Sequence, residues 1–180
     1  MVHLCTLEPA APWSVLAVTF TNKAANELRE RLSAFGIQGA ESVWAMTFHS
    51  ACVRILRRDI DRLGFSRDFT IYDTDDSKRV IKDILKELNI DEKKLTPREV
   101  LSAISNAKDA MESHQDYSRR WKGSGDWRKE AIAKIYTRYV HRLAEANALD
   151  FDDIILHAVT LLQQEGEVRD YYRRKFRYVL

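Results

Sequence analysis

Near the start of the chain, the run Thr19-Phe20-Thr21-Asn22-Lys23 contains the residue types needed to hold a phosphate and a base. Residues 15–20 are apolar and β-branched and predict a buried strand, whereas the apolar spacing of residues 24–32 predicts a helix. Ligands of open α/β sheets bind where such strands end, and helix-start N–H groups suit phosphate oxygens. Phe20, if exposed at this edge, could therefore stack on a base, and Lys23 could pair with a phosphate.

The same residues also have a purely structural interpretation, which spacing alone favours. Phe20 would then belong to the core, Thr21 and Asn22 would only cap the helix, and Lys23 would be a solvated charge.

A second set, Thr47-Phe48-His49-Ser50, lies between a predicted strand at residues 43–48 and another predicted helix. Two such edges from neighbouring strands would line one groove, in which His49 could donate to a phosphate or stack on a base. The alternative is a helix-capping Ser50 beside a histidine with ordinary hydrogen bonds. A catalytic Ser/His pair is disfavoured because no G-x-S-x-G turn surrounds Ser50.

Two acidic runs invite a metal-binding interpretation, which we reject. In Leu149-Asp150-Phe151-Asp152-Asp153 the adjacent carboxylates would fan out around a helix, and helix starts favour acidic residues in any case. We expect Asp150 to cap that helix. The run at residues 72–76 lacks the glycine and the distal glutamate of a calcium loop. The sequence therefore predicts no metal ligands.

Basic and aromatic residues alternate over residues 117–129 around a Gly-Ser-Gly stretch. This composition suits a nucleic-acid loop, whose candidate residues are Arg119, Arg120, Trp121 and Lys122. The alternative is a solvated loop with its two tryptophans packed onto helices. The sequence leaves both interpretations open.

The elements that must position these residues change character along the chain. Strands and helices alternate up to a predicted third strand at residues 69–72, which indicates a parallel α/β sheet. Residues 77–148 show helical periodicity only, with a capping-box start at Thr96-Pro97-Arg98-Glu99, a buried face from Leu101 to Met111 and a polar segment at residues 114–129. We predict a helix from residue 149, a basic helix at residues 167–175 and the opening of a buried strand at residues 176–180.

Bulk composition excludes several classes of protein. The 180 residues are 45% hydrophobic and 31% charged with a net charge of +2, so any nucleic-acid site must be a local patch. No apolar run approaches the roughly 18 residues of a membrane span, and residues 1–14 lack a basic leader. Cys5 and Cys52 form no CxxC pair, which argues against zinc and disulfides and favours the cytoplasm. The P-loop pattern G-x-x-x-x-G-K-S/T is absent.

Taken in order, these motifs resemble those of the UvrD/Rep/PcrA-type superfamily 1 DNA helicases, from Trp13 onward. Residues 17–28 resemble motif Ia, residues 47–50 the next DNA-contacting motif, and residues 149–153 the signature before the second ATPase motif. The resemblance implies a partial RecA-like domain 1A, residues 1–70 and 149–180, with a helical domain 1B, residues 71–148. It assigns single-stranded DNA contacts to Phe20, Thr21, Asn22, Lys23, Thr47, Phe48 and His49. It gives Asp150, Phe151, Asp152 and Asp153 a structural or coupling role.

The resemblance also implies a parent that uses ATP and Mg²⁺ to move 3′ to 5′ on single-stranded DNA. Its phosphate-binding motif would lie before Trp13, where residues 1–11 look unrelated, and its Asp-Glu motif would follow Leu180. We therefore expect a fragment with no catalytic residue, no cofactor and no ATPase activity by itself. Its expected partners are single-stranded DNA or a DNA junction, and other copies through exposed sheet edges. The alternatives are an ATP-independent DNA-binding module and a protein-interaction module.

Overall fold

A computed structural model describes residues 10–180 of the chain, which form a helix-rich α/β structure in two compact units. Of the described residues, the sheet unit comprises residues 10–62 and 158–180, and the helical unit comprises residues 63–157. The sequence analysis placed domain boundaries at 70/71 and 148/149, and that domain assignment stays a prediction. Cys5 and most of the segment that was judged unrelated lie outside the described residues.

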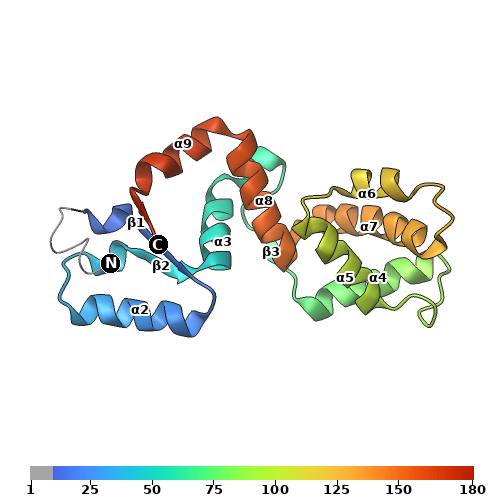
Figure 1. Cartoon of the computed structure of the whole chain (residues 1–180), viewed down its shortest axis with the longest axis horizontal. Helices are drawn as coiled ribbons and strands as arrows, with labels where there is room; N and C mark the ends of the chain where they lie inside the picture. The colour runs from blue at the N-terminus through green and yellow to red at the C-terminus, as the bar shows by residue number, and fades with distance from the viewer. Residues whose placement is uncertain (1–9) are drawn as a thin grey trace. The chain divides into compact units, whose positions relative to one another are not determined.

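The sheet unit is built on three parallel strands, β1 (Val15–Thr19), β2 (Trp44–Thr47) and β5 (Tyr178–Val179) (Figure 1). β1 lies in the middle, between β2 and β5. All three strands were predicted from the sequence. The prediction that β5 is buried was wrong, since Val179 is 64% exposed. Pairing of the outer strands with another copy stays a prediction.

Helices accompany this sheet as the alternating pattern predicted. They are α2 (Asn22–Ala34), α3 (Phe48–Asp59) and α9 (Gly166–Lys175), with short 3₁₀ turns at Pro12–Ser14, Ala40–Ser42 and Ile60–Leu63. α2 buries Leu32 against Val15, Val43 and Ala45 of the sheet region. Apolar positions three and four residues apart are what place this helix on the sheet.

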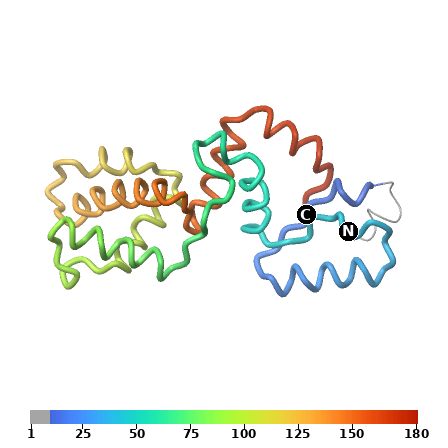
Figure 2. The backbone as a smooth tube through the Cα atoms, turned by 180° about the vertical axis from the view of Figure 1, so that it is seen from behind, coloured from blue at the N-terminus to red at the C-terminus, as the bar shows by residue number. Residues whose placement is uncertain are grey.

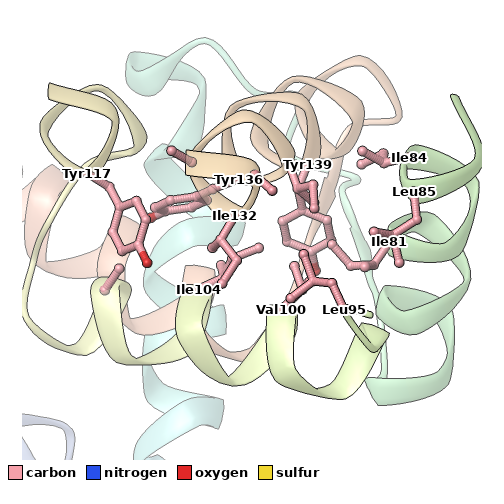
Figure 3. Close-up of a cluster of buried hydrophobic side chains, with 14 of the residues drawn as sticks. Ile81, Ile84, Leu85, Leu95, Val100, Ile104, Tyr117, Ile132, Tyr136 and Tyr139 are labelled. Atoms are coloured by element: carbon pink, nitrogen blue, oxygen red, sulfur yellow. The ribbon is translucent and has the colours of Figure 1, made fainter. Parts of the chain in front are cut away.

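The helical unit contains four complete helices, α4 (Thr74–Glu87), α5 (Pro97–Asp109), α6 (His114–Trp121) and α7 (Trp127–Glu145), and the first part of α8 (Phe151–Gln164). α7 packs against the other three, and Figure 2 shows it between α6 and α4. Figure 3 shows the core that they share, in which Tyr136 and Tyr139 are fully buried. The predicted capping box is confirmed, because Thr96 Oγ1 accepts from the Glu99 N–H at 3.2 Å and Glu99 accepts from the Thr96 N–H at 2.8 Å.

Two predictions about strands were wrong. β3 (Thr70–Ile71) does not join the three-stranded sheet but pairs in parallel with β4 (Ala148–Leu149) in the helical unit. The sequence showed no strand signal at Ala148. The helix start predicted at residues 149–153, with Asp150 as its cap, is confirmed, since α8 (Phe151–Gln164) begins at Phe151 and Asp150 accepts from the Asp153 N–H at 2.8 Å. Ladders of two residues carry too little periodicity to be recognised, and periodicity never states which strands pair.

Two helix boundaries also differ from the predictions. The polar segment at residues 114–129, of which residues 117–129 were interpreted as a loop, contains α6, whose cap Ser113 accepts from the Asp116 N–H at 3.1 Å. This helix buries only Tyr117 and so has almost no apolar face to detect. Met111, expected on the buried face of α5, is 47% exposed because the helix ends at Asp109 and Met111 has a left-handed backbone (φ +55°).

Candidate nucleic-acid interface

The end of β1 presents an exposed aromatic ring. Phe20 is 98% exposed, which excludes the alternative that it belongs to the core. Thr21 caps α2 by accepting a hydrogen bond from the Ala24 N–H at 3.2 Å, and Thr19 donates to the Thr21 carbonyl at 3.1 Å. Asn22 and Lys23 form the exposed first turn. The capping interpretation of Thr21 is therefore correct, and it leaves the ring of Phe20 in solvent.

The end of β2 has the same construction. Thr47, not Ser50, caps α3, since Thr47 Oγ1 accepts from the Ser50 N–H at 3.2 Å and lies 2.8 Å from Ser50 Oγ. The helix therefore begins at Phe48, which is 45% exposed, and His49 is exposed beside it.

These two helix starts lie at one edge of the sheet. β1 and β2 are neighbouring parallel strands, and Thr19 is the register partner of Thr47. Arg29 holds α2 to this region by donating from Nη1 to the Ala45 carbonyl at 2.8 Å. The structure thus brings together the two sets of residues singled out in the sequence, at the carboxyl edge where parallel sheets bind ligands.

In the basic and aromatic segment of the helical unit, the candidate residues Arg119, Arg120 and Trp121 already have partners. Arg119 pairs with Asp116 at 2.5 Å and Arg120 with Glu112 at 2.9 Å. The Nζ of Lys129 lies 3.7 Å from the centre of the Trp121 ring, which packs against the core. The packing of the Trp121 ring and the ion pairs of Arg119 and Arg120 favour the alternative in which Trp121 packs onto the helices. The DNA-binding role of residues 119–122 stays a prediction.

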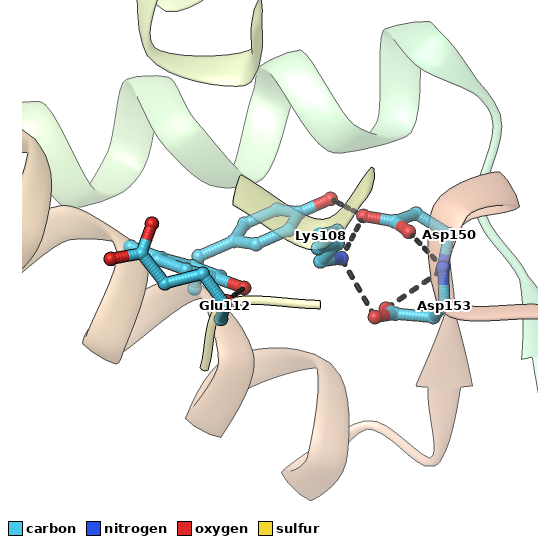
Figure 4. A network of polar contacts seen from close by, with 6 residues as sticks. Lys108, Glu112, Asp150 and Asp153 are labelled. Carbon is cyan, nitrogen blue, oxygen red and sulfur yellow. Dashed lines mark hydrogen bonds and ion pairs between the residues drawn. The ribbon is translucent and has the colours of Figure 1, made fainter. Parts of the chain in front are cut away.

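The acidic run at residues 150–153 forms a buried network rather than an open set of ligands (Figure 4). Asp150 and Asp153 cap α8 (Phe151–Gln164) reciprocally, with N–H to carboxylate distances of 2.8 and 3.2 Å. Lys108 of α5 places its Nζ 2.7 Å from a carboxylate oxygen of each. Tyr139 of α7 donates its hydroxyl to Asp150 at 2.9 Å. One ammonium group thus joins α5 to the first turn of α8.

Burial and charge act against each other in this network. Burial lowers the pKa of Lys108, but Asp153 and Asp150 raise it by more. Burial raises the pKa of Asp153 to about 6, with a further contribution from the charge of Asp150. The pKa of Asp150 is lowered, because the ammonium of Lys108 and the hydrogen bonds it accepts outweigh its burial. Two carboxylates share one ammonium, so a proton is held on Asp153 more readily than on Asp150.

Sequence reasoning missed Lys108. The signal was a lysine on the apolar face of a predicted helix, four residues after Ile104 and next to Ala107. A buried lysine requires a charged partner. Its partners lie 42 residues away in the chain, so no local pattern could name them.

Phe151 differs from its acidic neighbours, because its side chain is 50% exposed. It lines a cavity of about 330 Å³ in the helical unit together with Tyr72, Lys78 and Arg98. An exposed ring near two cationic side chains can receive a base and a phosphate. Phe151 is therefore a candidate contact residue, whereas the sequence analysis gave it a structural or coupling role.

His157 provides a test of these electrostatics by pH. Burial lowers the pKa of His157 to about 4, with a smaller contribution from the charge of Lys108, against an ordinary value of 6.5. A depressed pKa stabilises the fold above pH 6.5, and this contribution is lost as pH falls towards 4. The difference in free energy of unfolding between wild type and His157→Phe should therefore shift against wild type as pH falls. The shift should reach up to about 3 kcal/mol. Urea unfolding at a series of pH values measures both proteins.

Asp153 contributes with the opposite sign over part of that range, because its pKa is raised. Its stabilisation is greatest below pH 4 and is lost as pH rises through 6. The comparison of wild type with His157→Phe removes this contribution, which both proteins share. Parallel pH profiles for the two proteins would contradict the buried, neutral state of His157.

Residues 10–180 contain no group of three or more histidine, cysteine, aspartate or glutamate side chains positioned to hold a metal ion. Cys52, within the same range, is a buried free thiol whose pKa burial raises to about 11. No helix in the described part of the chain has the length and apolar character needed to cross a membrane.

A parallel sheet with two capped helix starts at its carboxyl edge, followed by a helical unit, defines a partial α/β domain of the RecA-like class. The chain belongs to the UvrD/Rep helicase family, since the family description "UvrD/REP helicase N-terminal domain" matches residues 1–180. The match includes residues 1–11, so the interpretation of that segment as unrelated was wrong.

Relatives within the family share much of the sequence. The chain is 44% identical over 179 residues to the ATP-dependent DNA helicase PcrA of Bacillus subtilis (strain 168). It is 45% identical over 179 residues to that of Staphylococcus aureus (strain Mu50 / ATCC 700699) and 42% identical over 179 residues to that of Staphylococcus epidermidis. Each alignment covers 99% of this chain, and the chain spans 24% of the length of each relative.

Proposed function

We propose that this chain supplies part of the single-stranded DNA-binding surface of an ATP-dependent DNA helicase, formed by the first turns of α2 and α3. The observation that carries the proposal is Phe20, a phenylalanine left 98% exposed at the carboxyl end of a buried strand. Exposure of a large apolar ring to water is unfavourable in free energy, and a base stacked on the ring would cover that apolar surface. The names of the relatives, ATP-dependent DNA helicases, support this assignment.

Each residue of the proposed surface has a distinct contribution. Phe20 and Phe48 offer ring faces to bases, and Lys23 offers a cation to a phosphate. His49 can donate to a phosphate or stack on a base. Thr21 and Thr47 hold the helix starts in place, and Asn22 lies at the exposed first N–H groups of α2, which suit phosphate oxygens. Separately from that surface, Phe151 of the helical unit is a candidate stacking contact.

ATP and Mg²⁺ belong, in this proposal, to the longer protein. The P-loop pattern that cradles a triphosphate does not occur in the 180 residues. The carboxylates of Asp150 and Asp153 already bind Lys108 and the helix start, which supports a structural role for them and not a metal-binding one.

Fluorescence anisotropy with a labelled oligo-dT strand tests the proposal, with wild type and Lys23→Met measured over a range of salt concentrations. Affinity should fall with salt, and loss of one phosphate contact should reduce the slope of log K against log salt by about 0.7. Lys86→Met is the matched control, because Lys86 is an exposed lysine of α4. Absence of binding, binding that high salt leaves unchanged, or equal slopes for the two variants would each contradict the proposal.

A further inference from the structure

A cavity of about 250 Å³ lies in the helical unit, and none of its lining residues is among those proposed to bind DNA. Its walls come from six parts of the unit, with Phe65, His114, Tyr136, Leu143, Asp153 and His157 among the lining residues. An apolar cavity of about 150 Å³ is enough to bind benzene, so this space suits a ligand of one or two rings.

Two pairs of aromatic side chains belong to the cavity wall. The rings of Phe65 and His157 have centroids 5.0 Å apart and are tilted by 54°. His114 meets Tyr136 edge to face, with centroids 6.1 Å apart. Walls of this kind favour a flat aromatic ligand, because ring edges and faces attract one another at these separations.

The polar groups of the wall select for a neutral ligand. Burial lowers the pKa of His157 to about 4 and also lowers the pKa of His114, so both imidazoles are neutral near pH 7. A neutral imidazole has one N–H donor and one nitrogen acceptor. The ammonium of Lys108, in the same wall, already contacts Asp150 and Asp153 at 2.7 Å. A charged ligand would lose hydration without gaining a strong partner.

We propose that this cavity binds a neutral, planar nitrogen heteroaromatic of one or two rings, with its ring among Phe65, Tyr136 and His157 and its nitrogen hydrogen-bonded to the imidazole of His157. The site is independent of the DNA surface proposed above. Because Asp153 lines the cavity and takes part in the cap of α8, a bound ligand would also contact the first turn of that helix and stabilise it.

Benzimidazole is a suitable probe, and indene is its hydrocarbon counterpart of the same shape. Nuclear magnetic resonance of the full chain, titrated with each compound at neutral pH, should show shifts at His157 and His114 that saturate. His157→Phe keeps a ring in the wall but removes both nitrogens. We expect it to weaken benzimidazole binding by about five- to tenfold and to leave indene binding unchanged.

A second variant guards against a folding defect in the first. Ala144→Phe places a ring at an exposed position of α7 that lines the cavity, and it should abolish binding of both compounds. Ala146→Phe, at an exposed position outside the lining, is the matched control and should bind as wild type. Equal binding by these two variants, no saturable shift at either histidine, or unchanged benzimidazole affinity in His157→Phe would each overturn the proposal.

Discussion

Lys108→Met is expected to lower the free energy of unfolding of the helical unit by about 3–5 kcal/mol. The ammonium of Lys108 lies 2.7 Å from both Asp150 and Asp153, and its side chain is only 2% exposed. Methionine fills similar space but leaves two buried carboxylates without their cation. The remaining hydroxyl of Tyr139 can satisfy only part of that loss. Urea unfolding, followed by circular dichroism, measures the change.

Two further variants make this result specific to the buried charge. Lys134→Met alters an exposed lysine of α7 and should change stability by no more than about 0.5 kcal/mol. The double variant Lys108→Met/Asp153→Asn has one fewer buried carboxylate without a cation. Its new asparagine side chain keeps an oxygen that can accept from the Asp150 N–H, so part of the lost stability should return. If the double variant were less stable than Lys108→Met, unpaired charge would not be the cause.

Phe20→Ala is expected to weaken binding of oligo-dT by about tenfold, since one base stacked on an aromatic ring contributes roughly 1–3 kcal/mol. The ring is almost fully exposed and Thr21 still caps α2 in the variant, so folding should be unaffected. Anisotropy with the labelled strand measures the affinity. The loss should persist at moderate salt, because stacking is not screened as phosphate contacts are.

Phe35 provides the matched control for this experiment. It is an exposed phenylalanine, 62% accessible, at the C-terminal cap of α2 and outside the predicted motifs. Phe35→Ala should leave DNA affinity at the wild-type value. Equal weakening by Phe20→Ala and Phe35→Ala would show that a general loss of apolar surface, and not stacking at the sheet edge, explains the effect.

Much of the local structure could be predicted from the sequence, because its causes act over three or four residues. The caps at Thr21 and Thr96 and the apolar spacing of α4 and α7 are of this kind. The predicted strand ends and helix starts also located the candidate DNA residues, whereas the function proposed for them came from the resemblance of the motifs to a family.

By itself, then, the sequence determined most of the helices, the caps at Thr21, Thr96 and Asp150, the three strands of the sheet and the resemblance to a family. The tertiary structure alone decided three other features: the pairing of β3 with β4, the exposure of Phe20, and the burial of Lys108 between two carboxylates. Each depends on groups far apart in the chain, such as Lys108 and Asp150, 42 residues apart. Local periodicity shows which face of a helix is apolar, but only packing determines what that face meets.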